Sequence, residues 1–471
     1  MTNEPIVKIN NSNSGSERAS KIESFKVMDI LQRANEIQNN EGRKVLHCEV
    51  GQPGTGAPKK VVEEAIKALS TKCSINGEQQ QNDQREVLGY TDAFGLLSLR
   101  EKIVQHYRNK YNNNDNNDTI TLNERLNVEN VIITTGSSGG FLLTFNGCFD
   151  VGDIIAVASS GYPCYRNIPQ ALGIDIASIN VNEEFKLTSK ELLQEIERRN
   201  KSNEKKIKGL ILSSPSNPTG AMLTPTELKE LCMLCDKYSI QFISDEIYHG
   251  ISYGKEEATA LSYSKNTIVI NSFSKYYSMS GWRLGWMIIP TNLVNVMNKL
   301  QQNMFISAPT ISQRAALKCW DDETINELND IVQCQYKVCR NYILNKLECM
   351  KDTIPTKNIA PADGGFYIYI DLGNDNVILS SNSSKSDDDN DDDQEKKRLD
   401  AVTFCTLFLE KEGVAFTPGI DFEDPNTMLG YRRLRISYAA GYDVVCEAME
   451  RFYKFWYNVW LPMIQNDRNN N

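Results

Sequence analysis

The sequence lacks any apolar run long enough to cross a membrane. Its longest candidates, such as IIAVA and WMII, have the length of a β-strand, whereas a membrane-spanning helix needs about 20 consecutive apolar residues. The first twenty residues also lack the apolar core of a secretory signal and the arginine-rich character of a transit peptide. We therefore expect a soluble, cytoplasmic protein without a membrane partner.

An excess of basic charge is missing as well. Asp and Glu number 61 against 51 Lys and Arg, which gives a formal net charge of −10. Because proteins that bind nucleic acids need positive side chains against the phosphates, we expect no nucleic-acid partner. The length of 471 residues is enough for two or three domains.

The twelve cysteines lack the spacing of a disulfide framework or of a zinc site. Cys232 and Cys235 lie close together, but no second pair completes a metal site. Their segment, TPTELKELCMLCDKYS, has Thr224 as a candidate N-cap and Pro225 at the first helical position. We expect both cysteines in the apolar core and no metal.

Polar tracts interrupt the sequence at residues 1–20, 75–86, 112–118 and 380–394. Such tracts cannot bury enough apolar surface to offset the entropy cost of ordering. We expect disordered tails at 1–20 and 466–471 and surface insertions elsewhere, including an acidic one at about 374–398.

Short runs rich in Val and Ile recur in the middle of the chain, at 131–135, 153–159, 207–213, 240–244 and 267–273. Their nearly continuous apolarity indicates strands covered on both faces. We predict an α/β fold whose large domain, residues 56–319, has a mostly parallel sheet flanked by helices. Strand-like segments at 364–372, 413–419 and 434–439 suggest a second, smaller α+β domain, which we assign to residues 21–55 and 320–465.

Three segments carry candidate chemistry. SFSKYYSMSGWR holds Ser272, Lys275 and Arg283, and the lysine could act as a nucleophile or base if burial or a cationic neighbour lowered its pKa. Alone, such a lysine is usually a solvated loop residue. TTGSSGG puts Ser137 and Ser138 at a strand-to-helix junction, which suits an anion, although such junctions are often rich in Gly and Ser for steric reasons.

The third set of candidates follows two buried strands. Asn217, in SNPTG, and Asp245 and Tyr248, in SDEIY, come at strand ends, where ligands of α/β proteins bind. A buried carboxylate needs a cationic partner, and a protonated ring nitrogen would serve. A helix cap is an equally good explanation for Asp245 alone.

Taken together, EVGQPG, GYTDAFG, TTGSSGG, SGYP, SNPTG, SDEIY, SFSKYYSMSGWRLGW and LRISYA, in this order and spacing, resemble the class I aminotransferases of the aspartate aminotransferase superfamily. These are pyridoxal 5′-phosphate enzymes of fold type I, and the resemblance runs from about Phe25 to Tyr457. It implies that Lys275 forms the internal aldimine with the cofactor and then moves the substrate proton. Asp245 would hold the pyridinium nitrogen, and Tyr248 and Asn217 the phenolic oxygen.

The resemblance assigns further contacts. It implies a phosphate site made by Ser137, Ser138, Ser272 and Arg283. Tyr162 would stack on the cofactor ring, a position that holds Trp in the best-known aspartate enzymes, and Tyr90 would reach the phosphate of a neighbouring subunit in a homodimer. Arg435 would bind the substrate α-carboxylate, with Gly51 against it, whereas Arg432 and Arg433 precede the strand and are expected at the surface.

The implied function is transfer of an amino group from an L-amino acid to a 2-oxo acid. The motifs include no counterpart of the second arginine that binds a dicarboxylic side chain in aspartate aminotransferases, so the sequence does not indicate specificity for aspartate. A β-lyase or an aminocyclopropane carboxylate synthase on the same scaffold is the alternative enzyme. A non-catalytic cofactor-binding module ranks lower, because Lys275, Asp245 and Arg435 are all present.

Overall fold

The computed structural model describes residues 16–20, 22, 24–70, 88–111, 122–379 and 398–470. A seven-stranded sheet with the order β2-β8-β7-β6-β5-β3-β4 occupies the centre. Its strands are β2 (Val131–Thr134), β3 (Ile154–Ala158), β4 (Asp175–Ile179), β5 (Ile207–Ser213), β6 (Gln241–Asp245), β7 (Ile268–Ser272) and β8 (Gly285–Ile288). Within this sheet β8 alone runs antiparallel to its neighbours. The prediction of a mostly parallel sheet is confirmed.

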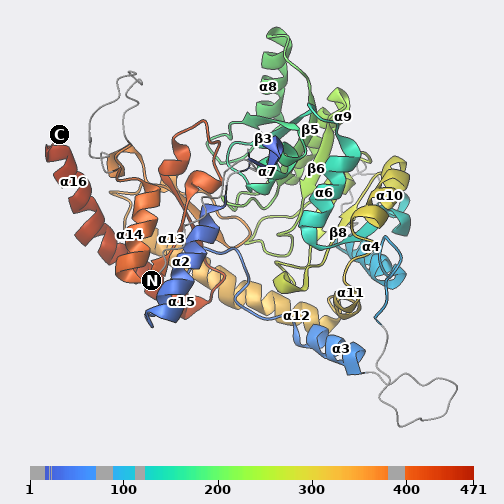
Figure 1. Cartoon of the computed structure of the whole chain (residues 1–471), viewed down its shortest axis with the longest axis horizontal. Coiled ribbons are helices and arrows are strands. Elements are labelled where there is room, and N and C mark those ends of the chain that lie inside the picture. The colour runs from blue at the N-terminus through green and yellow to red at the C-terminus, as the bar shows by residue number, and fades with distance from the viewer. Residues whose placement is uncertain are drawn as a thin grey trace, which may run out of the picture.

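Helices cover both faces of this sheet (Figure 1). Successive strand residues point to opposite faces, so Ile133 and Trp286 join one apolar cluster and Ile132 and Met287 join another. The first cluster includes side chains of α3 (Lys59–Ser70), α4 (Leu97–Tyr111), α8 (Ser189–Lys201), α9 (Pro225–Tyr238) and α11 (Thr310–Ala316). The second includes side chains of α6 (Gly136–Cys148), α7 (Cys164–Ala171) and α10 (Val294–Met304).

Two smaller sheets join the ends of the chain. An antiparallel sheet has the order β11-β12-β9, with β9 (Tyr367–Asp371), β11 (Thr417–Pro418) and β12 (Arg433–Ser437). Strand β1 (Leu46–His47) pairs with β10 (Val414–Ala415). Helix α2 (Lys26–Asn40) lies beside α14 (Ala401–Glu412) in Figure 1, and Arg33 forms two hydrogen bonds with Glu410. Helix α14 in turn contacts α15 (Tyr442–Phe455). The boundaries of the two domains remain our interpretation.

The local predictions for helix α9 are confirmed. Thr224 is its N-cap, and the Thr224 hydroxyl accepts a hydrogen bond from the backbone N–H of Glu227 while Pro225 begins the helix. The side chains of Cys232 and Cys235 are buried in the apolar core.

Two pairs of consecutive helices are each joined by a π-helical turn. Residues Ile331–Tyr336 join α12 (Asp322–Asp330) to α13 (Lys337–Glu348), and Trp456–Trp460 join α15 to α16 (Leu461–Asn470). We expected 466–471 to be disordered, but α16 continues to Asn470. Its last turn is held because Nη2 of Arg468 donates to the carbonyl of Asn374 at 3.0 Å.

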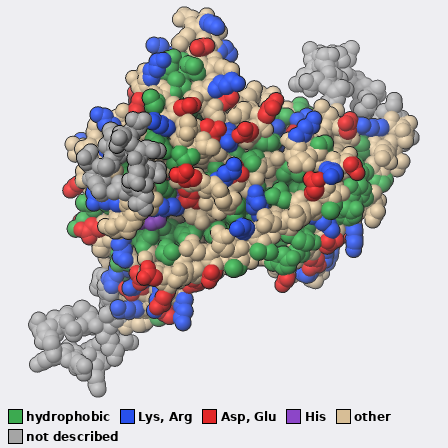
Figure 2. Space-filling view, turned by 180° about the vertical axis from the view of Figure 1, so that it is seen from behind, with side chains coloured by type: hydrophobic (Ala, Val, Ile, Leu, Met, Phe, Trp, Pro, Cys, Tyr) green, Lys and Arg blue, Asp and Glu red, His purple; other side chains and the backbone are tan. Residues whose placement is uncertain are grey.

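The N-terminal tail also differs in part from expectation. Residues Glu17–Ser20 form the short helix α1, which contacts α7. The remaining short helix is α5 (Leu122–Arg125). Residues 1–15, 75–86, 112–118 and 380–394 lie outside the described part of the chain. Figure 2 shows acidic and basic side chains intermingled over one face, and no described helix could cross a membrane.

Candidate active site

Asp245 lies at the carboxyl end of β6, in the middle of the large sheet. Its side chain is buried, its Oδ2 accepts a 2.5 Å hydrogen bond from the hydroxyl of Tyr165, and its Oδ1 accepts one from the N–H of Ile247 at 3.1 Å. Burial raises the pKa of Asp245 to about 6, although both donors and the positive charge of Lys275 oppose this effect. The carboxylate is therefore held by two neutral donors and no hydrogen-bonded cation among the described residues.

Lys275 follows the neighbouring strand β7 by three residues. Its Nζ donates a hydrogen bond to the carbonyl oxygen of Gly51 at 2.6 Å. Burial lowers the pKa of Lys275 to about 8, and the nearby charges of Arg435 and Arg283 act in the same direction. A lysine in this state has a substantial neutral fraction near neutral pH, as a nucleophile or a base requires.

Arg435 reaches the same region from β12 of the small antiparallel sheet. Its guanidinium donates from Nη1 to Oδ1 of Asn217 at 3.0 Å and from Nη2 to the carbonyl of Glu49 at 2.5 Å. The guanidinium carbon lies 4.6 Å from the ring centroid of Tyr367 and 4.4 Å from that of Phe422, so it is stacked between two rings. Its buried Nε has no hydrogen-bond partner among the described residues.

Tyr248 and Tyr367 form a hydrogen-bonded pair, and Tyr367 also packs against Gly51 and Arg435. The hydroxyls of Tyr248 and Tyr367 lie 2.8 Å apart, and both side chains are buried. A Cβ atom at position 51 would lie 1.8 Å from the Tyr367 hydroxyl. Gly51 is therefore required by the close approach of Tyr367, which leaves the Gly51 carbonyl in reach of Lys275.

The turn between β2 and α6 forms a cradle next to Arg283. Gly136 has a φ of +69°, and a Cβ atom there would lie 2.6 Å from Nη2 of Arg283. Ser137 and Ser138 follow in the first turn of the 13-residue helix α6, where backbone N–H groups and the helix dipole favour an anion. The hydroxyl of Ser272 lies 3.1 Å from the carbonyl of Leu284, at the start of the segment that carries β8.

Tyr162 and Tyr90 have different surroundings in a single chain. The ring of Tyr162 meets the ring of Tyr165 edge to face at 5.6 Å, beside the Asp245 site. Tyr90 is 82% exposed. The predicted residues thus converge at the carboxyl edge of the sheet, with the exception of Tyr90.

The sequence did not indicate three contributors to the site, and two arginines are less exposed than predicted. Tyr165, Tyr367 and Phe422 each touch a predicted residue, and the spacing of two tyrosines in SGYPCY was the available signal for Tyr165. Arg433 was expected at the surface, but it is the first residue of β12. It is largely buried, because Asp371 and Glu423 neutralise its charge.

Arg432 is only partly buried, and its Nε lies 2.6 Å from Oδ1 of Asp371. It is therefore less exposed than expected as well. The ion pair directs its guanidinium to the strand β9 rather than to solvent.

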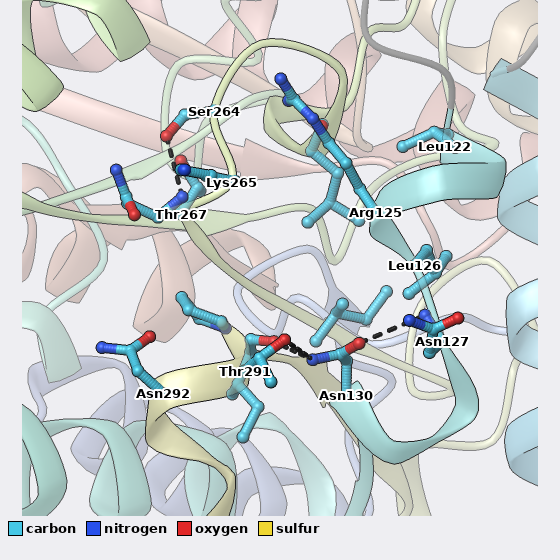
Figure 3. A pocket seen from close by; sticks show the side chains of 15 residues that line it. Leu122, Arg125, Leu126, Asn127, Asn130, Ser264, Lys265, Thr267, Thr291 and Asn292 are labelled. Atoms are coloured by element: carbon cyan, nitrogen blue, oxygen red, sulfur yellow. Dashed lines mark hydrogen bonds between the residues drawn. The ribbon is translucent and has the colours of Figure 1, made fainter.

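A separate cavity lies at the opposite edge of the sheet (Figure 3). It is lined by residues near the start of β7 and the end of β8, among them Arg125, Asn130, Thr267 and Thr291. Its lining contains none of the predicted site residues.

Comparison with known proteins supports this assignment. The family model for class I and II aminotransferases matches residues 43–451. The chain is 35% identical to the valine–pyruvate aminotransferase of Mycobacterium tuberculosis over 93% of this chain and 96% of the relative. It is 33% identical to the (5-formylfuran-3-yl)methyl phosphate transaminase of Methanocaldococcus jannaschii over 93% of this chain and 99% of the relative.

A solved structure gives the same result. The crystal structure of an aminotransferase from Mycobacterium tuberculosis superimposes with a TM-score of 0.77 at 35% sequence identity, covering 95% of this chain and 99% of that one. Members of the matched family use pyridoxal phosphate and act on amino acids and oxo acids. The fold, the site and these relatives together show that the chain belongs to the class I and II aminotransferases and is a transaminase.

Proposed function

We propose that this chain binds pyridoxal 5′-phosphate around Lys275 and transfers the amino group of an L-amino acid to a 2-oxo acid. The observation that carries the proposal is the convergence of three charged groups from distant segments. The side chains of Asp245 and Arg435 are buried, and the amine of Lys275 interacts electrostatically with both the carboxylate of Asp245 and the guanidinium of Arg435. When bound, the cofactor supplies an aldehyde that captures amines and a ring that withdraws electrons from the substrate Cα.

The residues fit the cofactor. The buried carboxylate of Asp245 has no hydrogen-bonded cation among the described residues. A protonated ring nitrogen of the cofactor would supply that cationic partner. Gly136 allows the close approach of Arg283 to the first turn of α6, where its guanidinium and the Ser137, Ser138 and Ser272 hydroxyls would hold a phosphate. Tyr162 would cover one face of the ring, and Tyr248 and Asn217 would hydrogen-bond its phenolic oxygen.

The chain's own groups account for substrate binding and proton movement. Arg435 retains a free N–H at Nε, so its planar guanidinium can bind the substrate α-carboxylate while it stays anchored to Asn217 and Glu49. The carbonyl of Gly51 holds Nζ of Lys275 close to this position. From there, Nζ would remove the proton from the substrate Cα. In the second half of the reaction, which runs in the reverse direction, Nζ would deliver a proton to the carbon that was the carbonyl carbon of the 2-oxo acid.

We also propose that the chain forms a homodimer. Tyr90 is exposed in one chain, and α3 presents Val62, Ile66 and Leu69 at helical spacing with exposed fractions of 36, 57 and 57%. Both α3 and Gly89, the neighbour of Tyr90, contact α11, and an apolar stripe together with an exposed aromatic residue supports contact with a second copy. Tyr90 would then reach the phosphate of its neighbour. The cytoplasmic location predicted from the sequence stays a prediction.

Borohydride reduction tests the central assignment. Protein loaded with pyridoxal phosphate is reduced and digested, and the peptides are mapped. We expect a pyridoxyl adduct at Lys275, and Lys265, an exposed lysine on the β6–β7 connection, serves as the internal control. A labelled Lys265 with an unlabelled Lys275 would overturn the site. In parallel, an amino acid should convert the bound cofactor to its amine form.

A further inference from the structure

The turn that contains Asp421 and Phe422 connects the Arg435 site to the first residues of α2. The carboxylate of Asp421 accepts two backbone hydrogen bonds, from Lys26 to Oδ1 and from Val27 to Oδ2, each 2.9 Å long. The N-cap residue of α2, Phe25, has no side-chain hydrogen bond of this kind. Asp421 therefore caps α2 from nearly 400 residues away, and its charge suits the positive end of the helix.

This cap positions an aromatic ring. Phe25 directly precedes the capped turn, and its ring centroid lies 6.4 Å from that of Tyr162. On the other side of the same turn, Phe422 stacks on the guanidinium of Arg435. The N–H of Gly161, next to Tyr162, donates to the carbonyl of Phe422 at 2.9 Å. The ring of Phe25 thus contacts Tyr162, and Gly161 ties Tyr162 to the turn whose Phe422 ring packs on Arg435.

The charged groups around these rings are held in place by hydrogen bonds. Both oxygens of Asp421 are used by α2, and Arg166 donates to the carbonyls of Asp421 and Phe422 at 2.8 and 3.2 Å. The ammonium of Lys26 lies 3.0 Å from Asp29. A second carboxylate on a substrate would lie near the negative charge of Asp421, which also interacts with Arg435, whereas an apolar side chain would gain by burial.

We propose that the site selects amino acids with uncharged, apolar side chains, and that Asp421 is a positioning residue that holds Phe25 in the wall facing the substrate side chain. This inference rests on the proposed function. The aromatic wall supplies contact area for an aliphatic or aromatic side chain, and it offers none of the paired donors that a dicarboxylic acid requires. Alanine is too small to reach the wall and should be insensitive to it.

Single-turnover conversion of the bound cofactor in the full-length holoenzyme tests the substrate class. We expect the ratio of maximal rate to half-saturating concentration to be at least about tenfold higher for leucine and phenylalanine than for aspartate and glutamate. Equal or faster conversion by a dicarboxylic acid would overturn the inference and leave the proposed function intact. Failure of every amino acid to convert the cofactor would instead overturn the proposed function.

Two variants test the wall itself. Phe25→Ala should reduce this ratio for leucine and phenylalanine about tenfold and leave alanine unchanged. Asp421→Asn should raise the half-saturating concentration of leucine with little change in the maximal rate, again without an effect on alanine. The matched control is Asp424→Asn, in the same turn, whose carboxylate binds Asn426 rather than α2. An unchanged preference in Phe25→Ala, or the same change in Asp424→Asn, would contradict the proposal.

Discussion

The hydroxyl of Tyr165 lies 2.5 Å from Oδ2 of Asp245, so a tyrosine three residues beyond Tyr162 is the closest hydrogen-bond partner of the buried carboxylate. The other partner is a backbone N–H. Both donors favour the ionised form and counteract the effect of burial on the pKa of Asp245. The negative charge that would face a ring nitrogen is thus maintained by Tyr165 before any ligand binds.

Tyr165→Phe should therefore impair cofactor binding and shift the pH profile. Loss of the donor raises the pKa of Asp245 above about 6, so a larger fraction of the carboxyl is protonated at neutral pH. We expect the affinity for pyridoxal phosphate to fall about tenfold and the acid limb of the activity profile to move to higher pH. Equilibrium titration and kcat/KM against pH measure both. Tyr263→Phe, in the β6–β7 connection, is the control, and an acid limb that stays in place would refute the role of Tyr165.

The acid–base state of Lys275 gives a second prediction. Burial, Arg435 and Arg283 lower its pKa to about 8, so the neutral amine becomes the major form above that pH rather than above 10.5. The rate at which cofactor-free protein captures pyridoxal phosphate at Lys275 should rise with pH, with a midpoint near 8. Trapping with borohydride at a series of pH values measures this rate.

A substitution of Arg435 separates the effect of its charge from the effect of burial on the pKa of Lys275. Arg435→Gln removes one positive neighbour, so the pKa of Lys275 should rise and the midpoint should move to higher pH. Arg432→Gln, on the same segment but paired with Asp371, should leave it unchanged. A midpoint near 10.5 in the unmodified protein would show that the amine is solvated.

The sequence predicted the site residues that belong to local motifs. Asp245 and Lys275 follow buried strands directly, and parallel strands bring their carboxyl ends to one edge. The contacts between Arg435 and Asn217 and between Tyr248 and Tyr367 join positions 218 and 119 residues apart. These contacts depend on how the small sheet docks on the large one, and no local pattern encodes that arrangement.

The antiparallel direction of β8 could have been predicted. Only residues 273–284 separate β7 from β8, and they form no α-helix. A parallel pair usually needs a helical crossover, so a connection without an α-helix favours an antiparallel pair. The length of α16 could not be predicted, because its last turn is held by a hydrogen bond to Asn374, which is far away in the sequence.

Arg435→Lys should weaken substrate binding without affecting the cofactor. An ammonium group cannot reproduce the planar stack between Tyr367 and Phe422 or a two-point contact with a carboxylate. We expect kcat/KM for amino acids to fall about 100-fold while the affinity for pyridoxal phosphate changes less than about threefold. Steady-state kinetics and cofactor titration measure the two effects. Arg432→Lys is the control, and an equal loss of cofactor affinity would place Arg435 in the cofactor site instead.

Residues 380–394 should be dispensable for catalysis. The segment is anchored at its base, where the N–H of Ile378 donates to the carbonyl of Leu399 at 2.8 Å and the reverse bond measures 3.2 Å. Because the two ends already lie side by side, the three residues 395–397 can close the loop after deletion. We expect unchanged cofactor content and kcat. Loss of either in a protein that retains its melting temperature would show that the acidic segment contributes to the working site.

Mixed dimers test whether Tyr90 acts across a subunit boundary. Tyr90→Ala and Lys275→Ala should each abolish or strongly reduce turnover in their own homodimers. If Tyr90 completes the site of its neighbour, a hybrid dimer contains one site with both native residues and one site that lacks both. Unfolding and refolding an equimolar mixture should give half hybrids, and therefore about a quarter of the unmodified activity.

Two measurements make that experiment decisive. Light scattering should give the mass of a dimer for each variant and for the mixture, so that failure to associate is recognised. Lys265→Ala, at an exposed position, replaces Lys275→Ala in the control mixture, which should then contain active homodimers in addition to hybrids. If the Tyr90→Ala and Lys275→Ala mixture forms dimers but recovers no activity, Tyr90 serves the site of its own chain. Its high exposure in one chain would then need another explanation.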